Sequence, residues 1–491
     1  MVVIKDRDIF FLTEPDGRVP LGTDHGFGLY YHDCRYLNGY VFTVGGKKLE
    51  SLVANAESGY MAMLALTNPD MTLPDGTKVR KHNLGVKLRR IVNGADLALY
   101  DLFTFENLSS HPLRFEFALS FRTAFEDLFE VRNFPRERRG HVLEPVWQGD
   151  DLRFIYDGAD DVYRSLTIHF SPSPVETQGT TALFRAELQP RESRQFLVSL
   201  LITESRNAEE TRAVRRTRPN LERMEAALQE ASARWLERDT QIFTDSMVLS
   251  RVLLRSLLDL NMLRSYVGRE EYFAAGVPWF VALFGRDSII TALQTLAFNP
   301  PWIAEHTIRL LAGFQGKKVD EWREEEPGKI LHEIRLGEMA NLNEVPHTPY
   351  YGTIDATPLF LILVGRHAAW TGDISVFNEL RGNVEAALEW ISRYGDIDGD
   401  GYVEYIGNPG KGLLNQGWKD SGDVVVNSDG SLAVPPIALA EVQAYVYQAK
   451  IEIARLYRQA SEPERAATLE REAEELRRRF NEDFWVDKGY Y

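Results

Sequence analysis

The hydrophobic period of this chain changes near residue 205, and this change constrains the fold more than any other feature. In Phe115–Arg122 every second side chain is apolar, and the same alternation returns in Leu166–Phe170. Phe196–Ile202 is almost continuously apolar, as expected of a buried strand. Glycine and proline turn signals separate these runs. Residues 1–205 are therefore predicted to form an antiparallel β-sandwich, with a β-barrel as the alternative.

After this region the period becomes helical. Residues 206–245 are charged and rich in Arg, Glu and Ala, which predicts a helical linker. Residues 246–491 contain about seven long amphipathic segments with no alternating strand between them. This pattern excludes a doubly wound α/β fold and leaves a helical repeat array or a toroid of paired helices. The segments lie near residues 246–267, 287–298, 302–315, 355–370, 374–394, 437–459 and 463–482.

Composition narrows the functional classes. The 491 residues carry 56 Lys and Arg against 72 Asp and Glu, a formal net charge of −16, which argues against nucleic acid as a partner. The single cysteine, Cys34, excludes an internal disulfide framework and a zinc site built on cysteines. No stretch of about 18 uninterrupted apolar residues predicts a membrane span, and the N-terminus lacks a secretion-signal pattern. We therefore expect a cytoplasmic protein with no membrane partner.

A first candidate site motif is the segment Ala275–Ser288. Arg286 and Asp287 are adjacent, and such a pair can donate to and accept from neighbouring hydroxyls of one sugar ring. Trp279 and Phe280 precede them, and an aromatic ring can cover the apolar face of a sugar. The alternative is that Asp287 or Ser288 is a helix N-cap and that Trp279 belongs to the core.

A second motif runs from Pro327 to Asp355. His332, Glu333 and Arg335, together with Glu338, are predicted to line one wall of a polar cleft. No second histidine follows His332 at the spacing that a zinc hydrolase of the zincin type requires. In the same motif, Tyr351 offers a further stacking surface. Asp355 is either a substrate-binding carboxylate or the N-cap of the next helix.

The third motif is Asn415–Asp423. It contains Trp418, Lys419 and Asp420 in a loop bounded by glycines. Hydrolysis of an acetal needs a protonated carboxyl at the leaving oxygen, and an apolar cover favours the protonated form. From these residues alone, Asp420 and Asp423 are both candidates for this acid, and an ordinary polar loop is the alternative.

A fourth motif places Asp396, Asp398, Asp400 and Glu404 in one short loop. The spacing matches the beginning of an EF-hand calcium loop, although Gly407 stands where that loop has its bidentate acid. The sequence leaves two readings open. One is a structural Ca²⁺ site with these four ligands, and the other is a metal-free turn after the preceding helix.

Taken together, these strings resemble the bacterial and archaeal amylo-α-1,6-glucosidase (glycogen debranching enzyme) family. Gly28–Leu37 and Asp127–Arg132 resemble the N-terminal β domain of that family. Five further strings, in the order found in the family, resemble its catalytic domain. They are Ala275–Ser288, Pro327–Glu338, Tyr351–Phe360, Gln416–Gly422 and Val434–Gln443.

This resemblance implies a β-sandwich followed by an (α/α)6 toroid that hydrolyses α-1,6-linked glucose branches of an α-glucan with inversion. It assigns the proton donor to Asp420, in the string Trp418-Lys-Asp420, in preference to Asp423. It also assigns contacts with the glucose at the cleavage point to Arg286 and Asp287. No cofactor is required for this reaction, and the expected partner is an α-glucan or oligosaccharide substrate.

One departure concerns the second catalytic group. A toroid of this kind needs twelve helices, so with about seven we expect the helical domain to be incomplete at its C-terminal end. The resemblance implies a glutamate as general base in the helices that would follow, and no sequence feature assigns that role to Glu333, Glu338 or Glu441. Two alternatives stay open. In the first, the same fold carries a different activity: that of another inverting α-glucosidase, of a trehalase-like enzyme or of a phosphorylase. In the second, the chain is an inactive carbohydrate-binding fragment. The oligomeric state is not predicted.

Overall fold

A computed structural model describes residues 1–56, 58–72, 76–212, 220–238, 240–298, 301–407 and 412–486. The chain divides into two compact units, which are described separately. The sandwich unit comprises Met1–Glu237, Ile242–Arg264 and Leu336–Glu344, and the helical unit comprises Arg238–Gln241, Ser265–Arg335 and Val345–Tyr491. In this division residues 206–237, 242–264 and 336–344 group with the strands of the N-terminal region.

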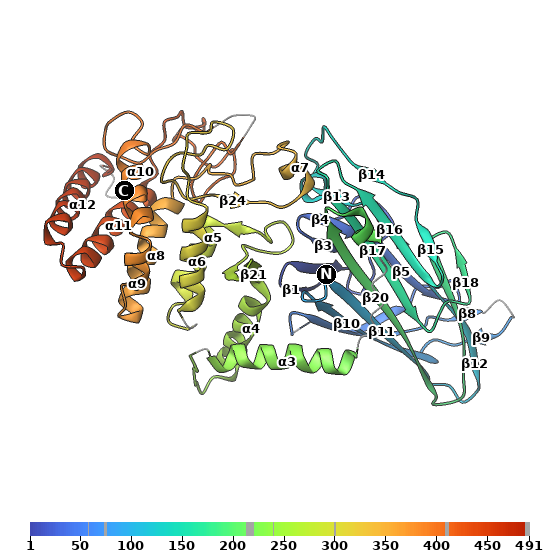
Figure 1. The fold of residues 1–491 in the computed structure, drawn as a ribbon. Helices are drawn as coiled ribbons and strands as arrows, with labels where there is room; N and C mark the ends of the chain where they lie inside the picture. Colours follow the sequence, from blue (N-terminus) through green and yellow to red (C-terminus); the bar gives the residue numbers. More distant parts are fainter. Residues whose placement is uncertain are drawn as a thin grey trace. The chain divides into compact units, whose positions relative to one another are not determined.

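Three antiparallel sheets form the sandwich unit (Figure 1). The largest has the strand order β14-β16-β17-β20-β11-β10-β7-β6, with β15 also paired to β16. Its strands are β6 (Glu50–Asn55), β7 (Met61–Thr67), β10 (Leu84–Asn93), β11 (Ala98–Asn107), β14 (His141–Val142), β15 (Val146–Gln148), β16 (Asp151–Asp157), β17 (Tyr163–Ser171) and β20 (Ser193–Ser205). A second sheet has the order β18-β19-β12-β5, with β5 (Gly39–Val44), β12 (Leu113–Arg122), β18 (Glu176–Gln178) and β19 (Thr181–Leu188).

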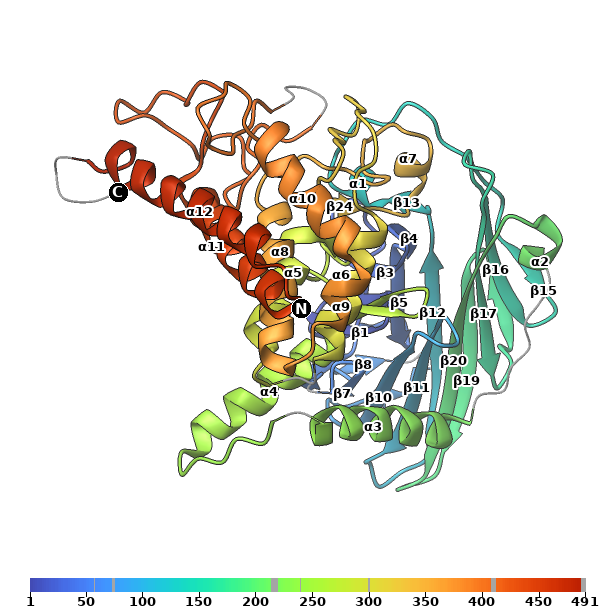
Figure 2. The ribbon, with the colours of Figure 1, turned by 60° about the vertical axis from the view of Figure 1, so that its left-hand side comes forward.

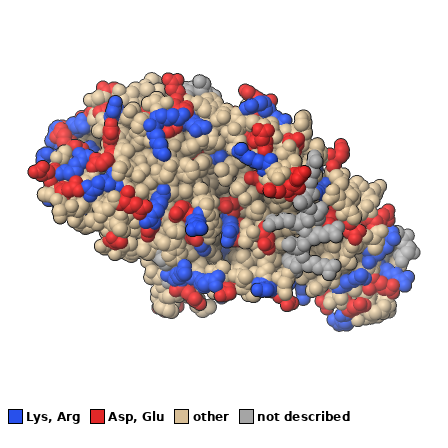
Figure 3. All heavy atoms as spheres, in the orientation of Figure 1, with Lys and Arg blue, Asp and Glu red and all other residues tan. Residues whose placement is uncertain are grey.

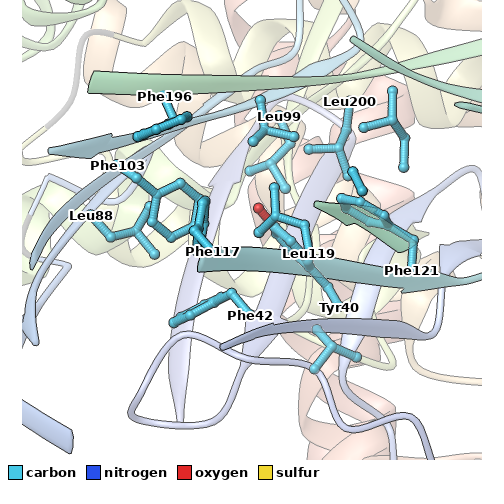
Figure 4. Packing of buried hydrophobic residues seen from close by; sticks show 14 of the residues in the cluster. Tyr40, Phe42, Leu88, Leu99, Phe103, Phe117, Leu119, Phe121, Phe196 and Leu200 are labelled. Atoms are coloured by element: carbon cyan, nitrogen blue, oxygen red, sulfur yellow. The ribbon is translucent and has the colours of Figure 1, made fainter. Parts of the chain in front are cut away.

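The core of the sandwich lies between these two sheets (Figure 4). Phe117 of β12 packs against Phe103 of β11, with ring centroids 5.0 Å apart, and against Phe196 of β20 at 5.8 Å. On β12, Phe115, Phe117, Leu119 and Phe121 are buried, as their period of two predicts. The inward faces of two antiparallel sheets thus share one aromatic core, which confirms the predicted β-sandwich rather than a closed barrel.

A third sheet contributes to the same core through residues such as Ile4, Phe11 and Tyr36. It has the order β1-β2-β3-β4-β13, with β1 (Val2–Asp6), β2 (Ile9–Thr13), β3 (Gly28–Tyr31), β4 (Cys34–Leu37) and β13 (Glu126–Asp127). A two-stranded ladder joins β8 (Met71–Thr72) to β9 (Lys78–Val79). The helices are α1 (Leu128–Val131), α2 (Ala208–Arg212), α3 (Leu221–Arg238), α4 (Met247–Leu263) and α7 (Glu338–Asn341).

A short segment, Leu336–Glu344, joins the sandwich unit although the chain on both sides of it belongs to the helical unit. Within the sandwich unit, the Tyr156 hydroxyl donates to Glu338 Oε2 at 2.6 Å, and Arg136 forms an ion pair with the same carboxylate. The Met339 amide donates to Asp127 Oδ2 at 3.0 Å. Glu338 therefore has a structural role in this unit.

The helical unit contains, among the described residues, helices arranged around α8. Helix α8 packs against α5, α6, α9, α10 and α11, and α11 packs against α12 (Figure 2). One predicted segment, 374–394, is two helices, because the backbone leaves the helical conformation at Leu380. The helices are α5 (Gly285–Thr295), α6 (Trp302–Gly313), α8 (Ala356–Thr371), α9 (Ser375–Glu379), α10 (Arg381–Arg393), α11 (Ala440–Gln459) and α12 (Pro463–Asp483).

Helix α8 is central because it is apolar on nearly all sides. Twelve of its sixteen residues are buried, and a helix of this kind must be covered by neighbours. Gly365 allows the close approach of α11, since a Cβ at this position would lie 2.5 Å from Glu452 Cβ. Two short ladders complete the unit: β21 (Arg264–Val267) with β22 (Glu270–Phe273), and β23 (Leu283–Phe284) with β24 (Glu333–Ile334).

The sequence argues against a membrane span and against nucleic acid as a partner, and the helices and the surface charge bear on these two expectations. None of the helices in the described part of the chain combines the length and apolar character that crossing a bilayer requires. On the face drawn in Figure 3, acidic and basic side chains are intermixed. On α12, for example, Arg477 pairs with Glu474, and Arg478 pairs with both Glu475 and Glu482.

Candidate active site

Arg286, in the first turn of α5, is the centre of the candidate site. Its Nη1 donates to Asp355 Oδ2 at 3.0 Å and to the Gly417 carbonyl at 2.9 Å. Its Nη2 donates to Asp420 Oδ2 at 3.2 Å. One guanidinium thus connects the beginning of α5, the beginning of α8 and the loop that carries Asp420, three segments that are far apart in the sequence. The structure brings together three of the carboxylate and guanidinium residues predicted from separate motifs.

Asp355 occupies the N-cap position of α8, but its side chain does not cap the helix. Its carboxylate instead accepts from Arg286 and, at 2.6 Å, from the Thr353 hydroxyl. The cap interpretation of Asp287 and Ser288 fails in a similar way. The N-cap of α5 is Phe284, and the Ser288 hydroxyl donates to the Phe273 carbonyl at 2.9 Å. The side chains of Asp355 and Ser288 are thus used for other contacts rather than for capping.

The loop that carries Asp420 is held by hydrogen bonds to its backbone carbonyls. The Ile354 amide donates to the Gln416 carbonyl at 2.9 Å, and Asn415 Nδ2 donates to the Ser421 carbonyl at 2.6 Å. Asp420 keeps 40% of its side chain exposed, which leaves one carboxylate face open to a ligand. Asp423, the other candidate acid, is exposed.

The two residues before Asp420 do not cover it. Trp418 is 69% exposed, so its indole does not shield Asp420 in this structure, and Lys419 is exposed as well. The exposed ring of Trp418 instead borders a groove of about 880 Å³ along α5, α8 and α11, together with Trp370 and Tyr445. This volume is in the range of small-molecule sites in proteins.

One wall of the site is built by β23 and β24. Gly285 is required here, since a Cβ on it would lie 2.1 Å from the Leu331 carbonyl oxygen. The Gly285 amide donates to the His332 carbonyl at 2.8 Å, and the His332 ring is packed between Phe284 and Tyr350. Burial lowers the pKa of His332 to about 3, so the imidazole is neutral near pH 7. His332 is therefore part of the packed wall.

Glu333 and Arg335 bind each other in the same wall. Arg335 Nε donates to Glu333 Oε2 at 2.6 Å, and His347 Nε2 lies 3.1 Å from Glu333 Oε1. Burial raises the pKa of the Glu333 carboxyl, but Arg335 and His347 outweigh burial and hold that pKa below its usual range. Arg335 Nη2 also donates to the Trp279 carbonyl at 3.0 Å. This ion pair fixes the loop that presents Trp279.

The predicted aromatic residues divide into exposed and buried ones. Phe280 is exposed and contacts Phe284 edge to face at 5.8 Å, while Trp279 is half-buried. Tyr351 is buried in the core, and its hydroxyl donates to the Phe314 carbonyl at 2.6 Å. Tyr351 is therefore placed as a structural residue, whereas Trp279 and Phe280 stay accessible to a ligand.

Some residues of the site are not found by reading the sequence. Glu324 accepts from the Tyr350 hydroxyl and from Gln416 Nε2, both at 2.8 Å, and so connects two of the predicted motifs. Burial raises the pKa of Tyr445, and the charges of Asp355 and Glu441 add to this effect. Glu441, in the first turn of α11, lies in the string Val434–Gln443 that carries part of the family resemblance.

The electrostatics of the candidate site are determined by the Arg286 guanidinium, which lies among several carboxylates. Burial lowers the pKa of Arg286, but Asp355 and Asp287 outweigh burial and raise it, so the guanidinium is permanently charged. Burial raises the pKa of the Asp287 carboxyl, and Arg286 opposes this shift. A fixed cation with half-exposed carboxylates beside it offers both donors and acceptors to a polyhydroxylated ligand.

The fold and this site define the class of the protein. It has an antiparallel β-sandwich unit followed by helices of the (α/α)6 toroid type, and the candidate site lies where α5 and α8 begin and at the loop that carries Asp420. Residues 4–199 match a sequence family described as the N-terminal domain of (some) glycogen debranching enzymes. No curated protein sequence matches the chain.

Solved structures extend the likeness to the helical unit. Over 96% of the chain, the structure is similar to a protein described as a candidate kojibiose phosphorylase from the human microbiome, with a TM-score of 0.60, 9% identity and 67% of that protein covered. It is also similar over 96% of the chain to a bacterial glucoamylase in complex with acarbose, with a TM-score of 0.55, 12% identity and 65% covered. The chain spans about two thirds of the length of these structures, and at such identities the likeness establishes the fold.

Proposed function

We propose that the protein is a glycoside hydrolase that releases glucose from α-1,6-linked branches of an α-glucan with inversion. The observation that carries the proposal is the shared guanidinium of Arg286, which holds the buried Asp355 and the half-exposed Asp420 within 3.2 Å. Asp355 and the Gly417 carbonyl keep Arg286 in place. Asp420 can then leave the guanidinium to meet a ligand without disordering the site.

In this proposal Asp420 leaves the guanidinium, takes up a proton from solvent and donates it to the glycosidic oxygen as the bond to C1 breaks. A water molecule attacks C1 from the opposite face, and a second carboxylate takes its proton, which yields β-glucose. Arg286 and Asp287 contact the hydroxyls of the departing glucose, and Trp418 offers an exposed ring face to the sugar.

None of the described glutamates is assigned as the general base of this mechanism. Glu333 is paired with Arg335, and Glu338 is bound by Arg136 and Tyr156, so neither is free to activate water. Glu441 lies closer to the cluster, where its charge acts on Tyr445. The resemblance implies a glutamate for this role, and the chain covers about two thirds of each of the two similar structures.

The test is glucose release from an α-1,6-branched limit dextrin by the full-length protein, with the product anomer followed by NMR. We expect β-glucose first, and a loss of turnover of about 10²–10⁴-fold in Asp420→Asn with substrate binding retained. Asp423→Asn, in the same loop, is the matched control and should keep turnover. Wild-type turnover in Asp420→Asn would refute the assignment of the acid.

Phosphorolysis is the second candidate, because one of the two similar structures is described as a kojibiose phosphorylase. It differs in its nucleophile: phosphate replaces water and yields a sugar phosphate. Running the same assay with and without inorganic phosphate distinguishes the two reactions. Release of glucose 1-phosphate that depends on phosphate would replace hydrolysis as the proposed activity.

A further inference from the structure

Glu324 lies in the loop between α6 and β24 of the helical unit and belongs to none of the motifs found in the sequence. Its Oε2 accepts from the Tyr350 hydroxyl and from Gln416 Nε2, both at 2.8 Å. Lys329 Nζ donates to the Glu324 backbone carbonyl at 3.3 Å and pairs with the Glu326 carboxylate. Among the described residues, two neutral donors from two different loops therefore hold the Glu324 side chain.

The Tyr350 hydroxyl is enclosed by the backbones of these loops. Tyr350 is fully buried, and its hydroxyl donates to Glu324 and accepts from the Leu413 amide at 2.8 Å. A Cβ on Gly352 or on Gly412 would collide with this hydroxyl. Two glycines thus let both backbones approach the pair formed by Tyr350 and Glu324, and little room is left for this pair to rearrange.

Gln416 connects Glu324 to the loop that carries Asp420. Gln416 is only 4% exposed, so its Nε2 would stay buried without an acceptor if Glu324 were removed. The next residue, Gly417, accepts from Arg286 Nη1 through its carbonyl at 2.9 Å. The beginning of the Asp420 loop is therefore fixed through the side chain of one residue and the backbone of the following one.

The backbone of Glu324 has an unusual conformation. Its φ of 51° lies in the left-handed region, which residues other than glycine seldom adopt. Hydrogen bonds fix the chain around it: the Tyr351 amide donates to the Arg323 carbonyl at 2.8 Å, and Asp320 and Glu325 exchange backbone hydrogen bonds of 3.0 Å. Such a conformation persists where the surrounding structure determines it, often at functional sites. Here it directs the Glu324 side chain to its two donors.

We propose that Glu324 is a positioning residue that holds the Asp420 loop in place through Gln416. In the proposed reaction, Asp420 has to leave Arg286 to reach the glycosidic oxygen. A loop that is anchored at Gln416 confines this movement to the side chain, which keeps the carboxyl within reach of the leaving oxygen. The effect on catalysis rests on the proposed function, whereas the anchoring of the loop does not.

Two substitutions separate the hydrogen bonds of Glu324 from its charge. Burial raises the pKa of the Glu324 carboxyl, and the hydrogen bonds from Tyr350 and Gln416 oppose this shift. In Glu324→Gln the amide oxygen can accept both hydrogen bonds, so the variant removes the charge and keeps the acceptor. Glu324→Leu removes the acceptor and leaves two buried donors without a partner.

The kinetic test is glucose release from the limit dextrin by the full-length protein. Glu324→Leu should lower kcat by about 10²-fold and leave KM nearly unchanged, because a displaced Asp420 weakens the transition state more than substrate binding. Glu324→Gln should restore most of this loss. Tyr350→Phe removes one of the two donors and should lie between them. Glu321→Leu, at an exposed acid of the same loop, is the matched control and should behave like the wild type.

Hydrogen exchange tests the anchor without substrate. In Glu324→Leu, peptides that cover residues 412–423 should exchange faster than in the wild type, because the Leu413 amide donates to the hydroxyl that Glu324 holds. Peptides from α8 should exchange as in the wild type, which shows that the helical unit is folded. If α8 also exchanges faster, Tyr350→Phe replaces Glu324→Leu in this comparison, with the same expected result for residues 412–423.

Three results would overturn the positioning role. They are unchanged exchange of residues 412–423, wild-type kcat in Glu324→Leu, or a loss in Glu324→Gln as large as that in Glu324→Leu. If Glu324→Leu loosens the loop but the wild type releases no glucose from the dextrin, the anchor stands and the proposed function fails.

Discussion

Two buried arginines, one in each unit, show opposite uses of the same side chain. In the sandwich unit, Arg90 Nε and Nη2 bind the two oxygens of Asp101 at 2.7 and 2.6 Å, and Nη1 donates to the Gly17 carbonyl at 2.7 Å. In the helical unit, Arg286 divides its donors between Asp355, Asp420 and the Gly417 carbonyl.

The two arrangements differ in whether a carboxylate remains accessible to a ligand. Arg90 and Asp101 are both buried and bind each other as a fork, and the Arg90 guanidinium lies 4.6 Å from the centre of the Phe11 ring. Arg286 is also buried, but one of its two carboxylates, Asp420, is partly open to solvent. A one-to-one buried ion pair stabilises a core, whereas one guanidinium shared between two carboxylates can release one of them to a ligand.

The largest effect is expected from breaking the closed pair. Arg90→Met should lower the free energy of unfolding of the sandwich unit by about 3–5 kcal/mol, because Asp101 would stay buried without its partner. The measurement is urea denaturation followed by circular dichroism. A loss below about 1 kcal/mol would remove the distinction between the closed and the shared arginine.

Weakening the interaction between Asp355 and Arg286 should change activity more than stability. Asp355→Asn keeps the shape of the side chain but removes one charge that holds Arg286, and we expect a fall in kcat of about 10²-fold. Because Asp355 and Asp420 act through one guanidinium, the double variant Asp355→Asn/Asp420→Asn should be no less active than Asp420→Asn alone. Losses that multiply would show that the two aspartates act independently.

Asp127, in the sandwich unit, is a buried carboxylate that no guanidinium in the described part of the chain binds, and it can be compared with the two arginine sites. Asp127 accepts hydrogen bonds from the amides of Phe129 and Met339, yet burial raises its pKa to about 6. Below about pH 4 the folded and unfolded forms are both protonated, and the folded form keeps its proton up to about pH 6. Relative to Asp127→Asn, the wild type should therefore lose about 2–3 kcal/mol of stability as the pH rises from 4 to 7. Parallel denaturation curves for the two proteins across this range would contradict the shift.

The smallest effect belongs to a pair at the surface. Arg114 and Glu187 lie opposite each other on β12 and β19, with Nε and Oε2 2.9 Å apart and both side chains exposed. Arg114→Met should change the free energy of unfolding by about 0–1 kcal/mol, because solvent and salt screen the pair. It is also the matched control for Arg90→Met in the same denaturation experiment, and a cost like that of the buried pair would mean that burial does not decide the difference.

The sequence predicts periodic features well because they are local. The alternation in Phe115–Arg122 predicts both the strand and its buried face, and the helical period predicts α8 to within about a residue. Motif spacing also brings Arg286, Asp355 and Asp420 to one site through the family resemblance. Each of these inferences depends on neighbours in the chain or on a recurring pattern of residues.

Partners that lie far apart in the chain are where such reasoning fails. Asp355 has the local signature of a helix cap, but an arginine 69 positions earlier takes its carboxylate. Trp418 stands two residues from Asp420, yet its ring turns to solvent. Glu338 follows His332 closely in sequence, but its hydrogen-bond partner Tyr156 lies 182 positions away in the sandwich unit. Sequence spacing shows which side chains are near each other only when the intervening backbone is regular.

The short excursion of Leu336–Glu344 into the sandwich unit has a consequence for how the protein is made. A ribosome completes β16 with its Tyr156 long before Glu338 emerges, and α5 and α6 of the helical unit are synthesised in between. The N-terminal unit therefore cannot reach its final hydrogen bonding while it is the only part outside the exit tunnel, although domains generally fold in the order of synthesis. Translation of the first helices therefore precedes completion of the hydrogen bonds that Leu336–Glu344 adds to the sandwich.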